Sequence, residues 1–532
     1  MSKLPDWTQL SLAEQIGQMV VVRASGYLFD HQIRYPTWEA TAAKLKRWLQ
    51  ELNLGGVIVL GGSAAELYLR IQQLQSWANL PLLVAADIEE GVGQWFGGAT
   101  HLPPPMALGA IAAADSARAR RYATQMGTVT AQEAVAVGIN WLLAPVVDVN
   151  NNPDNPAINV RSFADTAEVV SELATAFITG ARQYPVLTTA KHFPGHGDTA
   201  TDSHLNLPTL AHDAARLEAI ELLPFKRAIA AGVDSVMSAH LLIPAWDAQR
   251  PATLSPAISV QLRQRLGFEG LMVTDALIMG AVAQYAPPEA IAVMAVEAGA
   301  DVLLMPANPE RAIAAIHDAV CSGRITPERI HQSVARIWQA KSRVAQPPTS
   351  NERETLAVLP LAQSTSIDLR EEILQHSLLK GGNLPLEARS GRNLIVVDDV
   401  LKCSFLGRHT PAILYPQQAG YRLQLVDQNA LPTLLHSLPT LLQVFLRGNP
   451  FRGHAGLTSA AQDWLKQLLQ TQTVVGLLVY GSPYVLQWLQ EQIDESLPWV
   501  YSYGQMPAAQ AIACRTLLEM SDYDDIAAEA FL

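Results

Sequence analysis

A repeated alternation over the first 340 residues constrains the fold more than any other feature of this sequence. Short apolar runs rich in β-branched residues alternate there with alanine- and leucine-rich segments of helical periodicity. Most runs are continuously apolar, which is typical of parallel strands covered on both faces. Eight such runs, each followed by a helical segment, predict a (β/α)8 barrel of the TIM type. The runs are Gly17–Ala24, Gly55–Gly62, Pro81–Ile88, Asn140–Val149, Pro185–Phe193, Asp234–Leu241, Gly270–Leu277 and Asp301–Ala307.

A doubly wound parallel sheet is the alternative interpretation of this pattern. When that fold binds a dinucleotide, it carries a Gly-x-Gly-x-x-Gly turn after an early strand. No such turn follows an early run in this sequence. The pattern therefore favours the barrel.

A change in polarity near residue 340 indicates a second domain. The stretch Ser342–Glu354 contains two consecutive prolines and has the composition of an interdomain linker. We therefore expect a barrel over residues 1–341, a linker over 342–358 and a C-terminal domain over 359–532. Strand-like and helical segments alternate in this last part, which predicts a smaller αβα sandwich.

Composition and charge exclude several classes of protein. The 532 residues carry a formal net charge of −12, and 16% of them are charged. An acidic, charge-poor chain is a poor partner for nucleic acid or for an anionic membrane surface. Its three cysteines are too few and too far apart for a disulfide framework, which suits a reducing compartment. With no secretory pattern and no apolar run of about 18 residues, we expect a cytoplasmic protein; its oligomeric state stays open.

Polar residues gather at the expected carboxyl ends of the strands, where barrel enzymes place their active sites. Asp87 and Asp275 each end an otherwise apolar run, which favours a functional role over a capping role. Asp148 precedes an asparagine-rich turn and is at least as well explained as a loop residue. His240 fits a hydrogen-bonded structural histidine better than a catalytic one.

The loop Lys191–Pro208 holds the densest polar cluster: His192, His196, Asp198, Asp202 and His204. Histidine and aspartate can bind a metal ion, but the His-x-His typical of metal-dependent barrel hydrolases is missing after the first strand. General acid–base chemistry fits better, because Asp202 can orient His204, whose pKa lies near neutrality. With Asp275 as a carboxylate nucleophile, this is the layout of a retaining glycosidase in which histidine replaces the second carboxylate. We expect no metal and no cofactor.

Several motifs resemble glycoside hydrolase family 3, within it the β-N-acetylglucosaminidase branch. In the barrel the likeness is specific and collinear; in the second domain it is looser. The barrel motifs are Ala144–Val149, Asn152–Pro156, Val160–Phe163, Lys191–Thr199 with Asp202–His204, Pro251–Ser255, Gly267–Leu271 and Val273–Ala276. The second domain contributes His376–Lys380, Leu384–Leu386 and Tyr480–Tyr484.

The resemblance implies roles for individual residues. Asp275 would form a covalent glycosyl-enzyme, while His204 with Asp202 would protonate the leaving oxygen and later activate water. The residues that would hold the sugar in the −1 subsite are Asp87, Arg161, Lys191 and His192. The implied substrate is an oligosaccharide or small molecule with a terminal β-linked N-acetylglucosamine, plausibly a muropeptide fragment of the cell wall, cleaved in an exo manner.

The sequence departs from the family after the third strand. Family members usually read Asp-Gln-Glu-Gly-Gly there, often followed by arginine. This chain keeps Asp87, Glu89 and Gly91, but Glu90 replaces a glycine and Val92 the frequent arginine. The change concerns contacts in the −1 or +1 subsite and the natural aglycone, and it leaves the expected nucleophile and proton shuttle in place.

Three other functions remain open on the sequence. The enzyme could transfer the sugar to phosphate instead of water. The substrate's acetamido group could act as nucleophile, a mechanism that normally needs adjacent acids at a fourth strand end, where this chain has Asp148-Val149-Asn150. A sugar-binding relative without turnover is the third possibility.

Overall fold

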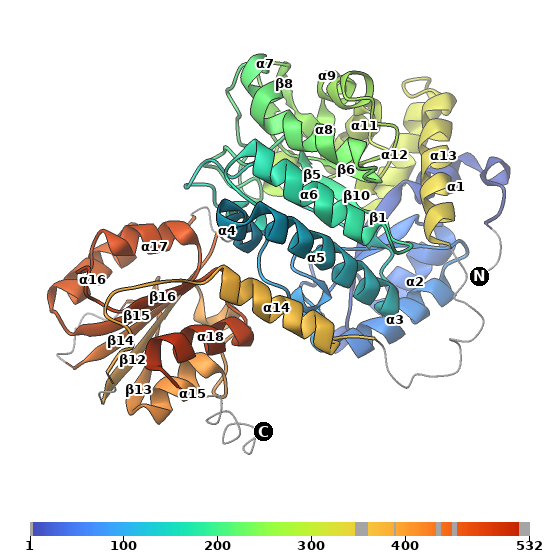
Figure 1. Cartoon of the computed structure of the whole chain (residues 1–532). Helices are drawn as coiled ribbons and strands as arrows, with labels where there is room; N and C mark the ends of the chain where they lie inside the picture. Colours follow the sequence, from blue (N-terminus) through green and yellow to red (C-terminus); the bar gives the residue numbers. More distant parts are fainter. Residues whose placement is uncertain (1–3, 346–359, 388–389, 432–437, 449–454, 521–532) are drawn as a thin grey trace. The chain divides into compact units, whose positions relative to one another are not determined.

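The computed structural model describes residues 4–345, 360–387, 390–431, 438–448 and 455–520 (Figure 1). The chain divides into two compact units: Met1–Asn152 with Arg161–Leu369, and Pro153–Val160 with Arg370–Leu532. Most of the expected linker, 342–358, lies outside the described residues. Helix α13 (Pro327–Val344) extends into its first three positions.

The first unit is built on eight parallel strands, one in each of the predicted runs. The pairing order β10-β1-β2-β3-β4 forms one sheet and β5-β6-β9 another. Parallel bridges from Trp141 to Leu187 and from Val273 to Val302 join the two sheets into a closed ring. The strands are β1 (Val20–Ser25), β2 (Gly56–Leu60), β3 (Leu83–Ala86), β4 (Trp141–Leu142), β5 (Thr189–Phe193), β6 (Ser235–Ser238), β9 (Leu271–Thr274) and β10 (Leu303–Leu304).

Helices surround this ring and cover the outer faces of the strands (Figure 1). Side chains at their first turns explain where several begin: Thr41, Ser63 and Asn308 each accept a hydrogen bond from a backbone N–H two or three residues into the helix. The helices are α1 (Leu12–Gln18), α2 (Ala42–Glu51), α3 (Ala64–Trp77), α4 (Met106–Ala114), α5 (Ser116–Val137), α6 (Ala167–Ala181), α7 (Ala214–Arg216), α8 (Leu222–Ala230), α9 (Pro256–Val260), α10 (Gly280–Ala283), α11 (Pro288–Ala298), α12 (Pro309–Cys321) and α13.

The barrel interior is a packed core that also satisfies its few polar groups. Trp141 on β4 is fully buried, and its indole N–H lies 2.9 Å from the Thr189 hydroxyl and 3.0 Å from the Ser235 hydroxyl. These contacts tie β4, β5 and β6 together across the ring. A hairpin of β7 (Leu242–Ile243) and β8 (Asp247–Pro251), which the simple alternation did not predict, is inserted after β6.

The second unit contains one six-stranded sheet in the order β11-β16-β15-β14-β12-β13. All its strand pairs are parallel except β11 with β16. Helices α15 and α18 pack on one face and α16 and α17 lie on the other (Figure 1), as expected for an αβα sandwich. The elements are β11 (Leu379–Gly381), β12 (Gly391–Val397), β13 (Tyr421–Asp427), β14 (Thr440–Leu446), β15 (Val474–Gly481), β16 (Trp499–Ser502), α15 (Pro411–Gln418), α16 (Ser459–Gln470), α17 (Pro483–Gln490) and α18 (Pro507–Leu518). The boundary between the two units falls inside helix α14 (Ser364–His376).

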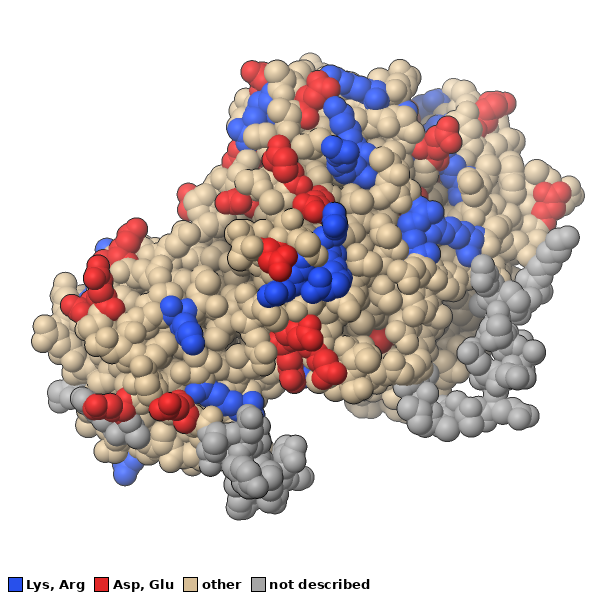
Figure 2. Space-filling view, in the orientation of Figure 1, with Lys and Arg blue, Asp and Glu red and all other residues tan. Residues whose placement is uncertain are grey.

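Charged side chains are scattered over the face of the molecule drawn in Figure 2. On the face shown in Figure 2, Lys and Arg lie among Asp and Glu, and most of the area belongs to other residues. Among the described residues, no helix combines the length and the apolar character needed to cross a membrane.

Candidate active site

Asp275 lies directly after β9, where the buried strand reaches the carboxyl-end rim of the barrel. Its backbone N–H donates to the Ser238 carbonyl at 3.0 Å, and its Oδ1 accepts the N–H of Ala276 at 2.7 Å. Burial alone would raise the pKa of Asp275, but the imidazoles of His192, His240 and His204 outweigh it and lower the pKa to about 2. The carboxylate is therefore ionised at neutral pH, as a nucleophile must be.

Asp202 and His204 form a hydrogen-bonded pair on the loop that follows β5. His204 Nδ1 lies 2.8 Å from Asp202 Oδ1, and the backbone N–H of His204 donates to the same oxygen at 2.9 Å. Because a carboxylate only accepts, Nδ1 carries the hydrogen and Nε2 is the nitrogen suited to moving a proton. Asp202 is buried while His204 is partly exposed. The structure thus brings together the pair that the sequence predicted.

His196 supports this loop from inside. Its Nδ1 lies 2.8 Å from the Thr199 hydroxyl and its Nε2 lies 2.9 Å from the Ser203 hydroxyl. Burial lowers the pKa of His196 to about 4, so the ring is neutral at pH 7. Hydroxyls can donate or accept, so a neutral ring satisfies both contacts. His196 positions the segment that contains the Asp202–His204 pair.

Helix α10 holds the other side of the same loop. The N–H of Gly280 donates to the His204 carbonyl at 3.1 Å, and the N–H of Ala281 donates to the Ser203 carbonyl at 3.2 Å. Gln284 donates its side-chain amide to the Leu205 carbonyl at 3.2 Å. A Cβ at position 280 would lie 2.7 Å from the His204 carbonyl oxygen, so the close approach requires glycine.

Three of the four residues implied to hold the sugar form an ion-pair cluster with Glu89, a residue that was not among the predicted sugar contacts. Lys191 Nζ lies 2.7 Å from Asp87 Oδ1 and 2.5 Å from Glu89 Oε1. Arg161 grips the same carboxylate in a fork, with Nε at 2.8 Å and Nη2 at 2.7 Å. Glu89 belongs to the Asp-x-Glu motif after the third strand, which was the available signal. The four residues named as sugar contacts also include His192, described next.

The opposite charges in this cluster keep one another ionised although the groups are buried. Desolvation opposes ionisation of Glu89, yet Arg161 and Lys191 lower its pKa well below the usual range. Desolvation likewise opposes charge on Lys191, and the carboxylates of Asp87 and Glu89 raise its pKa. Glu89 is buried, whereas the Asp87 side chain is 43% exposed. Asp87 is therefore the carboxylate of this pair that a ligand can reach.

Asp148 organises the turn between β5 and the loop that contains Asp202 and His204. Its buried carboxylate accepts the backbone N–H groups of His192 and His196, the latter at 2.7 Å, and lies 2.8 Å from His192 Nδ1. Burial opposes its charge, and His192 chiefly outweighs this and lowers the pKa of Asp148. The role of this residue is thus positional, within a network that fixes the His192 ring; the interpretation as a simple turn residue understated it.

His240 is held by both ring nitrogens. Nε2 lies 3.0 Å from the Ala276 carbonyl and Nδ1 lies 2.8 Å from the Thr253 hydroxyl. A carbonyl only accepts, so Nε2 carries the hydrogen, and burial lowers the pKa of His240. These contacts agree with the interpretation as a structural histidine, one that lies close enough to Asp275 to act on its charge.

The segment after β3, whose sequence differs from the usual family pattern, makes its contacts within its own loop. Glu90 Oε2 lies 3.2 Å from His101 Nε2, and the Glu90 N–H donates to the Gln94 side chain at 3.0 Å. Leu102 donates its N–H to the Glu90 carbonyl at 2.8 Å, and Val92 is fully buried. Residue 90 therefore joins the two ends of the loop, through the Glu90 side chain to His101 and through its backbone carbonyl to Leu102.

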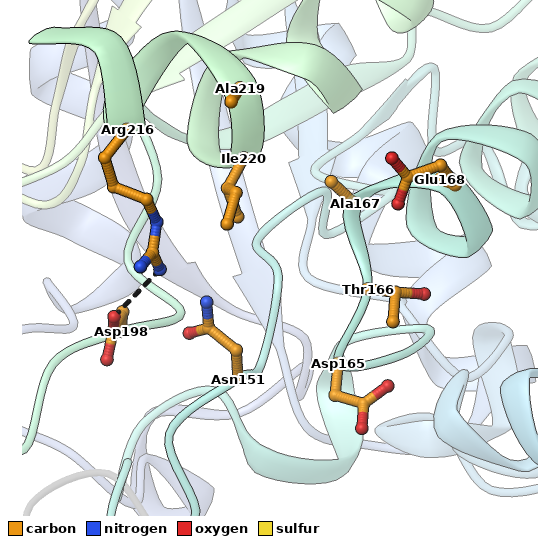
Figure 3. A pocket seen from close by; sticks show the side chains of 9 residues that line it. All are labelled: Asn151, Asp165, Thr166, Ala167, Glu168, Asp198, Arg216, Ala219 and Ile220. Carbon is orange, nitrogen blue, oxygen red and sulfur yellow. Dashed lines mark hydrogen bonds and ion pairs between the residues drawn. The ribbon is translucent and has the colours of Figure 1, made fainter.

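A second polar cluster includes Asp198 of the loop after β5 and borders a cavity of about 570 Å3. Asp198, His212 and Glu221 converge there closely enough to share a metal ion. Arg216 already bridges Asp198 at 3.1 Å (Figure 3) and Glu221 at 3.3 Å, so a protein cation pairs with two of these three residues. Asp275, Asp202 and His204 are not among the residues that line this cavity.

Comparison with known proteins finds a family match in each part of the chain. Residues 11–340 match the family described as "Glycosyl hydrolase family 3 N terminal domain", and residues 385–519 match "Bacterial Glycosyl hydrolase family 3 C-terminal domain". Beta-hexosaminidase A of Pseudoalteromonas piscicida is 31% identical over 435 residues, which cover 74% of this chain and 71% of that protein.

Two solved structures resemble both units. A glycoside hydrolase family 3 β-N-acetylglucosaminidase from Paenibacillus sp. str. FPU-7 superposes with a TM-score of 0.79 at 30% identity, covering 96% of this chain and 97% of that one. A β-glucoside phosphorylase gives the same TM-score at 22% identity, covering 96% of this chain and 92% of that one. The second likeness shows the fold alone.

Proposed function

Because the chain belongs to glycosyl hydrolase family 3, we propose that it is a retaining, exo-acting β-N-acetylglucosaminidase that releases terminal β-linked N-acetylglucosamine. The observation that carries the proposal is an ionised Asp275 at the end of β9 whose pKa is lowered in part by His204, the imidazole that is hydrogen-bonded to Asp202 on the loop after β5. The names of the β-hexosaminidase A from Pseudoalteromonas piscicida and the β-N-acetylglucosaminidase from Paenibacillus support this substrate class.

In the first step, the Asp275 carboxylate attacks the anomeric carbon and forms a glycosyl ester. The bond from that carbon to the glycosidic oxygen breaks, and His204 transfers the Nε2 proton to the departing oxygen. Asp202 stabilises the imidazolium before transfer and holds the ring through Nδ1. In the second step, His204 removes a proton from water, which attacks the same carbon and releases Asp275.

The sugar is held by the cluster around Glu89. The exposed carboxylate of Asp87 accepts hydrogen bonds from sugar hydroxyls, and Lys191 and Arg161 donate to hydroxyl oxygens. Glu89 stays with the two cations and keeps them in place. His192, fixed by Asp148, faces the same subsite from the start of the loop.

The direct test is release of p-nitrophenol from p-nitrophenyl β-N-acetylglucosaminide by the wild-type chain and by Asp275→Asn. We expect turnover by the wild type and a loss of several orders of magnitude in the variant. Equal rates would refute the assignment of Asp275, and no turnover by the wild type would leave a sugar-binding protein as the better account. A 2-fluoro or 5-fluoro glycosyl adduct found on Asp275 by peptide mass would exclude attack by the acetamido group.

Phosphate is the competing acceptor. A histidine acid–base group, neutral after it has given its proton, repels an anionic acceptor less than a carboxylate does, so this site could accommodate phosphate. Product analysis with and without phosphate separates the two reactions. We expect free N-acetylglucosamine in both cases; a sugar 1-phosphate formed at its expense would make the enzyme a phosphorylase.

Muropeptides, with N-acetylglucosamine at the non-reducing end, are the proposed natural substrates.

A further inference from the structure

Trp95 stands out among the tryptophans of this chain. All eleven lie in the described residues, and Trp95 is the only one in the exposed class, at 44%. Exposing so large an apolar ring to water is unfavourable, and such rings mark binding surfaces more often than other exposed residues do.

The indole is tied to the sugar-binding cluster. Its Nε1–H donates to the backbone carbonyl of Asp87 at 2.7 Å. The side chain of the same Asp87 is the exposed carboxylate that pairs with Lys191. A single strand end thus offers a carboxylate for hydroxyls and, next to it, an aromatic surface for C–H groups.

The segment around Trp95 is built to hold it there. Phe96 is fully buried, and its N–H donates to the Val92 carbonyl at 3.1 Å. Gly97 pairs with the start of helix α3, where its carbonyl accepts the Ala64 N–H at 2.8 Å. Trp95 therefore projects from a backbone fixed on both sides, so its exposure belongs to the fold.

The strand order places Trp95 at a definite end of the subsite. In the closed ring β1-β2-β3-β4-β5-β6-β9-β10, strand β3 lies opposite β9. Asp275 follows β9 and attacks the anomeric carbon, so the groups that follow β3 face the other end of the pyranose, around C4 and C6.

We propose that Trp95 forms the wall of the −1 subsite at the end distal to the anomeric carbon and packs against the C–H surface of the terminal N-acetylglucosamine. This makes it a specificity-determining residue for the glycone; the inference rests on the proposed function. A wall at this end also leaves room for only one sugar on the non-reducing side of the scissile bond, which is what exo action requires.

We expect Trp95→Ala to weaken sugar binding by the same factor whatever the leaving group is. Trp95→Ala is compared with the wild type on p-nitrophenyl β-N-acetylglucosaminide and on N,N′-diacetylchitobiose, together with inhibition by free N-acetylglucosamine. Both KM values and the inhibition constant should rise by the same factor, about 3- to 10-fold for one aromatic contact, with kcat changed less than about twofold. Trp95→Phe, which keeps a ring, should recover part of the affinity.

Leu69→Ala is the control, because Leu69 on α3 is 45% exposed and has no place in the proposed site; its kinetics should match the wild type. A loss with the disaccharide alone would move Trp95 to the aglycone side and overturn the proposal, as would unchanged constants in Trp95→Ala. A wild type that turns over neither substrate and does not bind N-acetylglucosamine would instead refute the proposed function, and this inference with it.

Discussion

His204 Nδ1 lies 2.8 Å from Oδ1 of Asp202, a carboxylate that is buried while the imidazole is partly exposed. The buried partner fixes the tautomer, and the partly exposed ring stays accessible from solvent. In the proposed mechanism, these two residues of one loop divide the work of the catalytic acid between orientation and proton transfer.

Asp202→Asn should lower kcat strongly while the fold persists. The amide can still contact Nδ1, but it cannot stabilise the imidazolium and can favour the wrong tautomer; we expect a loss of about 10²- to 10⁴-fold. Steady-state kinetics on N,N′-diacetylchitobiose checks this. Asp165→Asn is the control, because Asp165 is an exposed carboxylate at the same rim. Similar kcat values for both variants would exclude the proposed role of Asp202.

His204→Ala should affect substrates according to their leaving groups. A p-nitrophenolate leaves with little protonation, whereas a sugar alkoxide needs a proton from the acid. We expect a far smaller loss of kcat/KM on the aryl substrate than on the disaccharide. Comparable losses on both would mean that His204 is not the acid.

Glu89→Gln should destabilise the protein and weaken sugar binding together. The variant leaves Lys191 and Arg161 buried with less compensation, which typically costs about 3–5 kcal/mol. Denaturant unfolding measures the stability and KM reports the binding. Glu310→Gln is the matched control, since Glu310 pairs with Arg47 at an exposed position and should cost less than about 1 kcal/mol. Equal losses of stability in the two variants would show that burial does not make the Glu89 ion pairs more stabilising than an exposed pair.

Lys341 should make stability depend on pH in the alkaline range. Its ammonium is buried and donates to Gln18 at 2.6 Å, and burial lowers its pKa from 10.5 to about 7. Between these values the unfolded chain binds a proton that the folded chain does not, so stability should rise with pH from about 7 to 10.5. Lys341→Met should remove this component of the slope in unfolding experiments at stepped pH. An unchanged slope would show that the folded protein keeps Lys341 protonated.

Gly280→Ala should displace the catalytic loop. The new methyl group would lie 2.7 Å from the His204 carbonyl oxygen, closer than contact allows. We expect kcat to fall at least tenfold with a modest change in melting temperature. Gly407→Ala is the control, because its methyl group would have only one neighbour, at 4.0 Å. Wild-type kinetics in Gly280→Ala would mean that the loop does not depend on this close approach.

The sequence was most informative where a pattern is local. Eight apolar runs predicted eight strands, because a strand covered on both faces needs continuous apolar residues whatever its neighbours are. Asp275 and Asp87 were found because each interrupts such a run at its end. The hairpin of β7 and β8 was not predicted, since two short strands of mixed exposure leave no periodic signal.

The site residues that were missed or undervalued depend on contacts between distant segments. Glu89 was not singled out, because its importance comes from Arg161, 72 positions away. Asp148 looked like a turn residue, and its partner His192 lies 44 positions further along the chain. Charge, burial and partner together define these roles, and a single sequence displays only the charge.

The amino-acid sequence by itself determined the alternation that closes into a barrel, the αβα sandwich after it and the family motifs that contain Asp275, Asp202 and His204. Only the tertiary structure decided the contacts that hold the rim residues in place. His204 is hydrogen-bonded to Asp202, and His192 to Asp148. Glu89 forms ion pairs with Arg161 and Lys191, and the Trp95 indole donates to the Asp87 carbonyl. The reason is physical. Local periodicity follows from burial along one strand or helix, whereas ionisation and orientation at the rim follow from which strand ends the closed ring brings together.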